Sequence, residues 1–195
     1  KNESLSVTKV LKKFSYNAFS VAPNMQMSVN ENWQHLNDYL DAMKTKFRVK
    51  AKKAFQQSAS LEIKEVTLEN ISQQLPAMTA LYKKVSTNAV FNLTNFNSNT
   101  YKYFLEKLGE AYILKTFYLE GKMVGFLSGM ITDDSLDAHF VGIDYDLNRQ
   151  HAIYQRMLYT YIEIAIHKKL KVINFGRTAS EIKSSVGAVP QDLTM

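Results

Sequence analysis

The sequence predicts an α+β domain, because two kinds of hydrophobic periodicity occupy different parts of the 195-residue chain. Over most of the first half, apolar residues recur at spacings of three and four, which is typical of amphipathic helices. From Ala111 the period changes to two, which is typical of strands, and a strand–helix–strand unit follows. These observations predict helices, then an antiparallel meander, then one parallel crossover.

The first half is predicted to hold an extended arm followed by three helices and a strand. Residues 5–29 read as short extended segments, so residues 1–29 are interpreted as an arm or linker from an upstream domain, with the main domain at 30–195. The elements expected after the arm are a helix at about 32–58, a strand at 61–66, a helix at 68–86 that Pro76 should kink or split, an Asn-rich loop at 92–100 and a helix at 101–108 that ends at Gly109.

The second half is predicted to form most of the sheet. Strands at 111–119 and 122–132 are joined by Glu120-Gly121, a two-residue hairpin signal, and a third strand is expected at 138–145. The helix expected at 153–167 is apolar nearly all round, so it should be buried against the sheet. A strand at 172–175 should then lie parallel to the strand at 138–145.

Composition excludes several classes of protein. The chain is 46% hydrophobic and 22% charged, which is typical of a folded globular domain. It has no cysteine, so it has no disulfide framework, thiol nucleophile or thiolate metal site, and we expect a cytoplasmic location. No apolar run approaches the length of a membrane span. The four histidines lack ligand spacing, so no metal site is expected.

The net charge of +6 is concentrated in the segment KTKFRVKAKK at residues 44–53. This concentration indicates a negatively charged partner, which would be a phosphate-bearing cofactor, a nucleic acid or an anionic lipid surface. The alternative is a solvated helix face, because the apolar residues of this segment fall on the opposite side of the same helix.

The crossover carries the candidate site. Ligands of open sheets bind beyond the carboxyl ends of parallel strands, which here carry Asp144-Tyr145 and Gly176-Arg177. The segment 146–151 leads into a helix N-terminus that could hold an anion, and Arg149, Arg177 and Lys183 could add positive charge. The alternative is that Asp144 and Arg177 form an ion pair that only closes a corner. No nucleophile elbow, phosphate loop or dinucleotide fingerprint is present.

Two motifs then give a resemblance to a known family. The first is Trp33-x5-Tyr39-Leu40-x5-Lys46-Phe47-Arg48, and the second is Asn174-Phe175-Gly176-Arg177 with Ile182-Lys183-x-x-Val186-Gly187-Ala188. In this order the chain resembles the GNAT acyltransferase superfamily, and specifically its FemAB-like branch (peptidoglycan biosynthesis/recognition, BioF-associated acetyltransferase-like). Ile182 and Val186 stand where that branch has aromatic residues.

The resemblance implies a bacterial-type transferase that moves an acyl or aminoacyl group from an activated donor to an amine, within a sheet that splays between its two parallel strands. Asp144 is then the first candidate base, with His139 behind it, and Tyr145 could protonate the leaving group. Lys183 matches a lysine associated with substrate phosphates. The residues expected to contact the donor are Arg149, Gln150, His151, Arg177 and Thr178.

Donor and acceptor stay open at this stage. GNAT enzymes cradle coenzyme A with a glycine-containing loop, whereas residues 146–152 contain no glycine. The donor would be acyl-coenzyme A, as a co-substrate rather than a covalent cofactor, or a charged transfer RNA, and the amine acceptor is not specified. The alternative function is a non-catalytic binding or structural half of a two-domain protein, which docks an anionic partner through residues 44–53.

Overall fold

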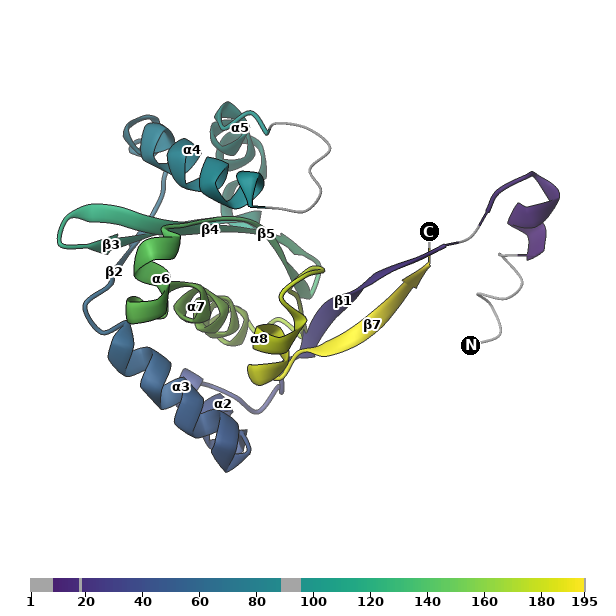
Figure 1. Ribbon diagram of the computed structural model, residues 1–195, viewed down its shortest axis with the longest axis horizontal. Helices are drawn as coiled ribbons and strands as arrows, with labels where there is room; N and C mark the ends of the chain where they lie inside the picture. Colours follow the sequence, from purple (N-terminus) through teal and green to yellow (C-terminus); the bar gives the residue numbers. More distant parts are fainter. Residues whose placement is uncertain (1–8, 18, 89–95, 195) are drawn as a thin grey trace.

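The computed structural model describes residues 9–17, 19–88 and 96–194, which form a seven-stranded mixed sheet with helices on both faces (Figure 1). The strand order is β2-β3-β4-β5-β6-β1-β7, and β5 and β6 are the parallel pair. The strands are β1 (Ser20–Ser28), β2 (Glu62–Glu65), β3 (Tyr112–Leu119), β4 (Lys122–Thr132), β5 (Ser135–Ile143), β6 (Val172–Asn174) and β7 (Val189–Thr194).

The helices divide into two layers that cover opposite faces of the sheet (Figure 1). On one face, α4 and α5 pack on the strands of the meander, and on the other α7 lies against the sheet with the remaining helices around it. The helices are α2 (Leu36–Ala42), α3 (Thr45–Gln57), α4 (Ile71–Thr87), α5 (Asn99–Leu108), α6 (Tyr145–His151), α7 (Ile153–His167) and α8 (Ser180–Ser185), with a 3-10 turn at η1 (Gly109–Ala111).

Two hydrophobic clusters hold these layers together. The cluster on the α7 face includes Ile153, Met157 and Ile162, which are fully buried because α7 is apolar nearly all round. The cluster on the α4 face contains Met78, Tyr101 and Phe126 among others. Each helical layer therefore buries one face of the meander, and the sheet lies at the centre of the core.

The predicted α+β class, the meander and the parallel crossover are confirmed. In the hairpin between β3 and β4, Glu120 and Gly121 both have positive φ (50° and 78°), the conformation that a type I′ turn requires. The helix expected at 153–167 has the predicted bounds, and α5 ends at Gly109, whose φ is 52°. Strand β5 begins at Ser135, three residues before the predicted start.

Three expectations about the first half need correction. The helix expected at 32–58 is two helices, because Met43 and Lys44 have extended ψ angles of 144° and 140° that separate α2 from α3. Residues 9–13 are helical rather than extended. Helix α4 continues through Pro76, so the expected split does not occur, and a kink at Pro76 stays a prediction. Part of the Asn-rich loop predicted at 92–100 lies outside the described residues, and the helix predicted at 101–108 begins at Asn99.

The end of the predicted arm belongs to the sheet. Strand β1 pairs with β6 on one side and with β7 on the other, both antiparallel, and Met25 and Met27 are buried in the core. In Figure 1, β1 and β7 extend from the body of the domain as a two-stranded ribbon. An origin of residues 1–29 in an upstream domain stays a prediction.

Packing against β5 predicts the effect of one small substitution. A Cβ atom on Gly142 would lie 2.8 Å from Leu81 Cβ and would overlap the buried Phe126 ring, so Gly142→Ala should lower the free energy of unfolding by about 1–3 kcal/mol. At Gly125 an added Cβ would mainly meet the flexible terminal methyl of Met157, so Gly125→Ala should cost less. Urea unfolding of both variants checks this, and an equal loss would contradict it.

Candidate functional site

The parallel strands β5 and β6 pair over only three positions, and the last pair is Asp137 with Asn174. Strand β6 ends at Asn174, and the chain turns away at Gly176, which has a φ of 75°. Strand β5 continues to Ile143 with no strand beside it on that edge among the described residues. The position of Asp137 and Asn174 is called the divergence point below.

A β-bulge in β5 lies just beyond the divergence point. The register with β4 shifts between Leu127 and Gly129, so that Ser128 faces both His139 and Phe140. The Ser128 hydroxyl accepts a hydrogen bond from the Phe140 amide (2.9 Å) and donates one to the Phe140 carbonyl (3.1 Å). A bulge bends its strand and increases its twist, which accounts for the separation of β5 from β6.

At the divergence point, four polar side chains form what is called the Asp137 network (Asn24, Gln26, Asp137, Asn174). Asn174 Nδ2 donates to Asp137 Oδ1 at 2.6 Å, and Asn174 Oδ1 accepts from Gln26 Nε2 at 2.9 Å and Asn24 Nδ2 at 3.3 Å. All four side chains are half-buried. The sequence predictions missed this network, because the expected strand at 138–145 excluded Asp137, although period two places Asp137 on the same face as His139.

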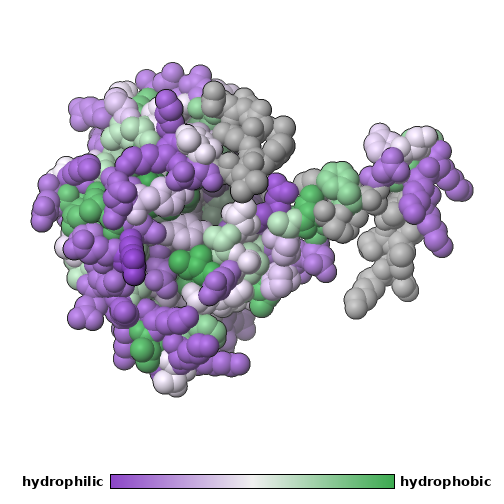
Figure 2. All heavy atoms as spheres, in the orientation of Figure 1, coloured by the Kyte–Doolittle hydropathy of each residue, from purple (hydrophilic) through white to green (hydrophobic). Residues whose placement is uncertain are grey.

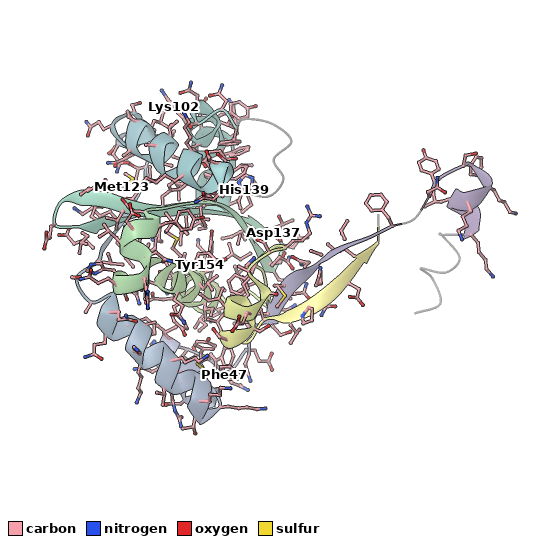
Figure 3. All side chains as sticks on the ribbon, viewed as in Figure 1. Phe47, Lys102, Met123, Asp137, His139 and Tyr154 are labelled. Carbon is pink, nitrogen blue, oxygen red and sulfur yellow. The ribbon has the colours of Figure 1, made fainter. Side chains whose placement is uncertain are left out.

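His139 lies on the α4 face, two residues beyond Asp137. Its ring centroid lies 4.0 Å from that of Phe140 and 5.8 Å from that of Phe104. The residue is exposed overall, and desolvation of the ring packed against these aromatic side chains lowers the pKa of His139 below its usual value of 6.5. Figure 3 shows His139 beside α4 and Asp137 nearer the β1–β7 ribbon, with Tyr154 on the opposite side of the sheet. His139 is therefore mainly a neutral imidazole at pH 7, which can accept a proton.

Asp144, the first candidate base, lies at the far end of β5 and is the N-cap residue of α6. Its side chain is buried, with Oδ2 at 3.3 Å from Lys84 Nζ and 3.6 Å from Lys122 Nζ. The predicted alternative of an ion pair between Asp144 and Arg177 is wrong, since Asp144 is paired with these two lysines instead. Next to it, Tyr145 is exposed, and partial burial raises the pKa of its hydroxyl.

The segment expected to lead into an anion-binding helix terminus is itself a helix. Arg149, Gln150 and His151 form the last turn of α6, and Ala152, with φ 45°, separates α6 from α7. Asn148 Oδ1 accepts a hydrogen bond from the Tyr154 amide at 2.9 Å, so one of the free N–H groups at the start of α7 is already satisfied. Arg149 and Gln150 are exposed and His151 is half-buried.

Lys183 lies in α8 and is buried. Its Nζ donates to the carbonyl oxygens of Gly176 (3.2 Å) and Arg177 (2.8 Å), so the ammonium group holds the corner that follows β6. Burial lowers the pKa of Lys183 to about 8. Arg177 and Thr178 are exposed on the same corner, where Thr178 has a φ of 66°. The structure thus brings Lys183, Arg177 and Thr178 together, separately from Asp144 and Tyr145.

A groove of about 830 Å³ lies between α3 and α8, on the α7 side of the sheet, and is called the α3–α8 groove. Among the residues that line it are Lys46, Phe47, Lys50, Gln155, Ile182 and Ser184. It shares Phe47, Ser184 and Ser185 with an adjoining apolar pocket of about 430 Å³ that contains Trp33 and Tyr39. In Figure 2 hydrophilic residues cover most of the visible surface, including much of that over α3.

Two lysines of α3, which contains the predicted basic segment, therefore line the α3–α8 groove. Lys46 and Lys50 belong to no ion pair in the described part of the chain, and Glu181 is the acidic residue that lines the groove. Tyr39 donates a hydrogen bond to the Val186 carbonyl at 2.9 Å, which joins the first sequence motif to the second. The groove combines positive charge with apolar surface, which suits an amphiphilic phosphate compound.

Within residues 9–17, 19–88 and 96–194, no group of three His, Asp or Glu side chains is arranged to hold a metal ion. In the same part of the chain, no helix combines the length and the apolar character that crossing a membrane would need.

The diverging parallel strands, with a buried crossover helix between them, define the class of the domain as a GNAT-type fold, as the sequence predicts. The chain belongs to the FemAB-like family, described as peptidoglycan biosynthesis/recognition, which matches residues 9–193. A comparison with curated protein sequences finds no match.

Solved structures share this fold at low sequence identity. FemX has a TM-score of 0.66 and 8% identity over 96% of this chain and 66% of that one. A conserved protein of unknown function from Bacteroides thetaiotaomicron has a TM-score of 0.62 and 15% identity over 97% and 65%. L-PGS from Bacillus licheniformis has a TM-score of 0.51 and 13% identity over 88% and 50%. The chain thus spans two thirds or less of the length of these proteins.

The buried Lys183 ammonium predicts a pH dependence of stability. The pKa of Lys183 is lower in the folded state (about 8) than its ordinary value of 10.5, so the unfolded state binds more protons between these values. The contribution of Lys183 to stability should therefore rise with pH across this window, by at most about 1.4 kcal/mol per pKa unit. In the Lys183→Met variant this increase of stability with pH should be absent. Melting temperatures of the variant and the unmodified protein at pH 7 to 10 measure the difference.

The exposed Lys46 supplies the control for this experiment, because Lys46→Met removes a charge of the same kind from the surface. Its melting temperature should follow that of the unmodified protein across the pH range. An identical pH profile for Lys183→Met and the unmodified protein would show that the Lys183 ammonium is not desolvated.

Proposed function

We propose that this domain transfers an acyl or aminoacyl group from an activated donor to an amine, with a role in cell-envelope biosynthesis. The observation that carries the proposal is the divergence of β5 and β6 after three paired residues, in a chain of the FemAB-like family. Beyond that point the edge of β5 offers backbone N–H groups with no strand partner in the described part of the sheet. Such groups can stabilise the negative charge that forms on an acyl oxygen during transfer.

The α3–α8 groove is the proposed site for the phosphate-bearing part of the donor. Lys46 and Lys50 supply positive charge there, and Arg177 and Thr178 lie on the corner next to α8. The turn at 146–152, which lacks glycine and is largely α6, is a weaker candidate for this role. The proposed donors are acyl-coenzyme A and charged transfer RNA. Each has phosphates that the positive charge of the groove could bind, together with an activated carbonyl.

Positioning supplies most of the catalysis in this proposal. Holding an amine and an activated carbonyl in attack geometry can lower the barrier by about 7 kcal/mol or more. Of the two proton acceptors predicted from sequence, His139 is better placed, because it lies next to the divergence point and is mainly neutral at pH 7. Two lysines engage Asp144, and Lys183 holds the corner after β6, so both serve the architecture of the strand ends.

A second function is favoured by the charge on α3. Lys46 and Lys50 line the groove, and Lys52 and Lys53 are exposed on the same helix, so the helix could dock an anionic partner without any chemistry. Such binding would weaken steeply with salt, because displaced counterions dominate binding to polyphosphates. Only the transferase predicts turnover that depends on the donor. An upstream domain of the same chain stays a further proposed partner.

Calorimetric titration with acetyl-coenzyme A, long-chain acyl-coenzyme A and uncharged transfer RNA at two salt concentrations tests the donor site. We expect saturable one-to-one binding of one of these compounds, which Lys46→Gln combined with Lys50→Gln weakens by roughly tenfold, or about 1.4 kcal/mol. Lys52→Gln with Lys53→Gln removes the same charge from the same helix outside the groove, and it should weaken binding much less.

Each outcome of this titration has a distinct meaning. Equal losses in the two double variants would show that the helix attracts anions by net charge alone, which supports the docking function. An absence of binding by all three compounds would contradict the proposed donor classes. Kinetics of His139→Gln and Asp144→Asn then separate a proton acceptor from a structural carboxylate, because only loss of the acceptor should lower turnover while donor affinity is kept.

A further inference from the structure

Asp137 is a half-buried carboxylate that none of the proposed donor contacts uses. Oδ1 accepts the hydrogen bond from Asn174, and no other hydrogen bond or ion pair reaches this carboxylate from the described residues. It differs in this from Asp144, which faces two lysines. A half-buried carboxylate with no cation beside it attracts a cationic ligand.

The orientation of Asp137 is set by the rest of the network. Asn174 Oδ1 receives two N–H donors, from Gln26 and Asn24, so the Asn174 amide must direct its NH2 group toward Asp137. The opposite orientation would place three NH2 groups against one another. The 2.6 Å bond then fixes Oδ1 and leaves Oδ2 available to a ligand.

Strand alternation places this network on the face of the sheet opposite the α3–α8 groove. Leu136, Ile173 and Met25 point into the core on the α7 face, so the network residues that alternate with them point to the α4 face. The groove lies on the α7 side, together with α3 and α8. A donor in the groove and a ligand at Asp137 would therefore lie on opposite faces of the sheet.

We propose that Asp137 binds the ammonium group of the acceptor and takes its proton, held in position by Asn174 and Gln26. The inference rests on the proposed transfer to an amine and assigns the acceptor the chemistry of a primary ammonium compound. His139, two residues along the same face, is the neighbouring titratable group on this strand, and the other members of the network are neutral amides.

The step balances with an ester or thioester donor as co-reactant. The ammonium nitrogen gives one proton to Asp137 Oδ2, and its freed lone pair attacks the acyl carbon. The C–N bond forms, and the bond from the acyl carbon to the oxygen or sulfur of the donor breaks. His139 takes the second proton of the nitrogen and passes it to that leaving atom, and the proton on Asp137 returns to solvent.

The test uses the 15N-labelled chain, with n-propylammonium chloride as the cationic probe and n-propanol as the neutral probe of the same length. The side-chain amide signals of Asn174 report on the carboxylate that it touches. We expect saturable shifts at millimolar n-propylammonium, which is fully protonated at pH 7, and no comparable shifts with n-propanol. Asp137→Asn should abolish the response.

Asp134→Asn is the matched control, because Asp134 is an exposed carboxylate of the preceding turn that pairs with Lys171 at 2.8 Å. It should leave the response of Asn174 unchanged. Equal shifts with both probes, a response that survives in Asp137→Asn, or no response in the unmodified chain would each overturn the inference. The comparison of the two probes needs no variant, so it tests for a cation site beside Asn174 even if Asp137→Asn does not fold.

Donor titration in the same samples separates this inference from the proposed function. If the ammonium response is present and no donor binds, the transferase proposal fails while the cation site stands. If a donor binds and the ammonium response is absent, only the role of Asp137 fails. With a donor that binds, Asp137→Asn should lower kcat/KM by about 100-fold or more while the donor Kd stays unchanged.

Discussion

The arrangement of the candidate site depends on the insertion of one extra residue into β5 opposite Ser128. The hydroxyl of Ser128 bonds both the amide and the carbonyl of Phe140, which stabilises the bulge instead of leaving its polar groups without partners. Because of that extra residue, His139 and Phe140 both pack toward the α4 face. The strand then bends away from β6, and Asp137 becomes the last paired residue.

The charged side chains near the ends of β5 and β6 hold the structure together, unlike the polar groups at the divergence point. Asp144 joins the end of β5 to α4 and β4 through Lys84 and Lys122, and Lys183 holds the corner after β6 through two carbonyl groups. These contacts keep the diverging ends in place. In the described part of the chain, Asp137 and His139 on one face and Lys46 and Lys50 on the other belong to no ion pair, and these are among the groups that we propose to contact ligands.

Periodicity in the sequence predicted the meander, the crossover helix and the parallel pair, because each has a strong local pattern and turn residues such as Glu120 and Gly121. The break between α2 and α3 was not predicted, because the sequence at Met43 and Lys44 continues the helical spacing and contains no glycine or proline. The pairing of β1 depends on contacts about 150 positions away, for which a local pattern has no signal. Asp144 was predicted as a charged residue at a strand end and Lys183 through the family motif. Asp137 was missed because the predicted strand starts at 138, three residues after β5 begins.

The position of β1 between β6 and β7 also affects how the chain is made. Strand β1 is among the first parts of the described chain to be synthesised, yet both of its neighbours come from residues 172–194. Until those residues leave the ribosome, Met25 and Met27 have no core to enter, and both edges of β1 lack partners. Such long-range pairing is slow to form, and a chain that stops before residue 172 would leave both edges of β1 without partners and open to pairing with other chains.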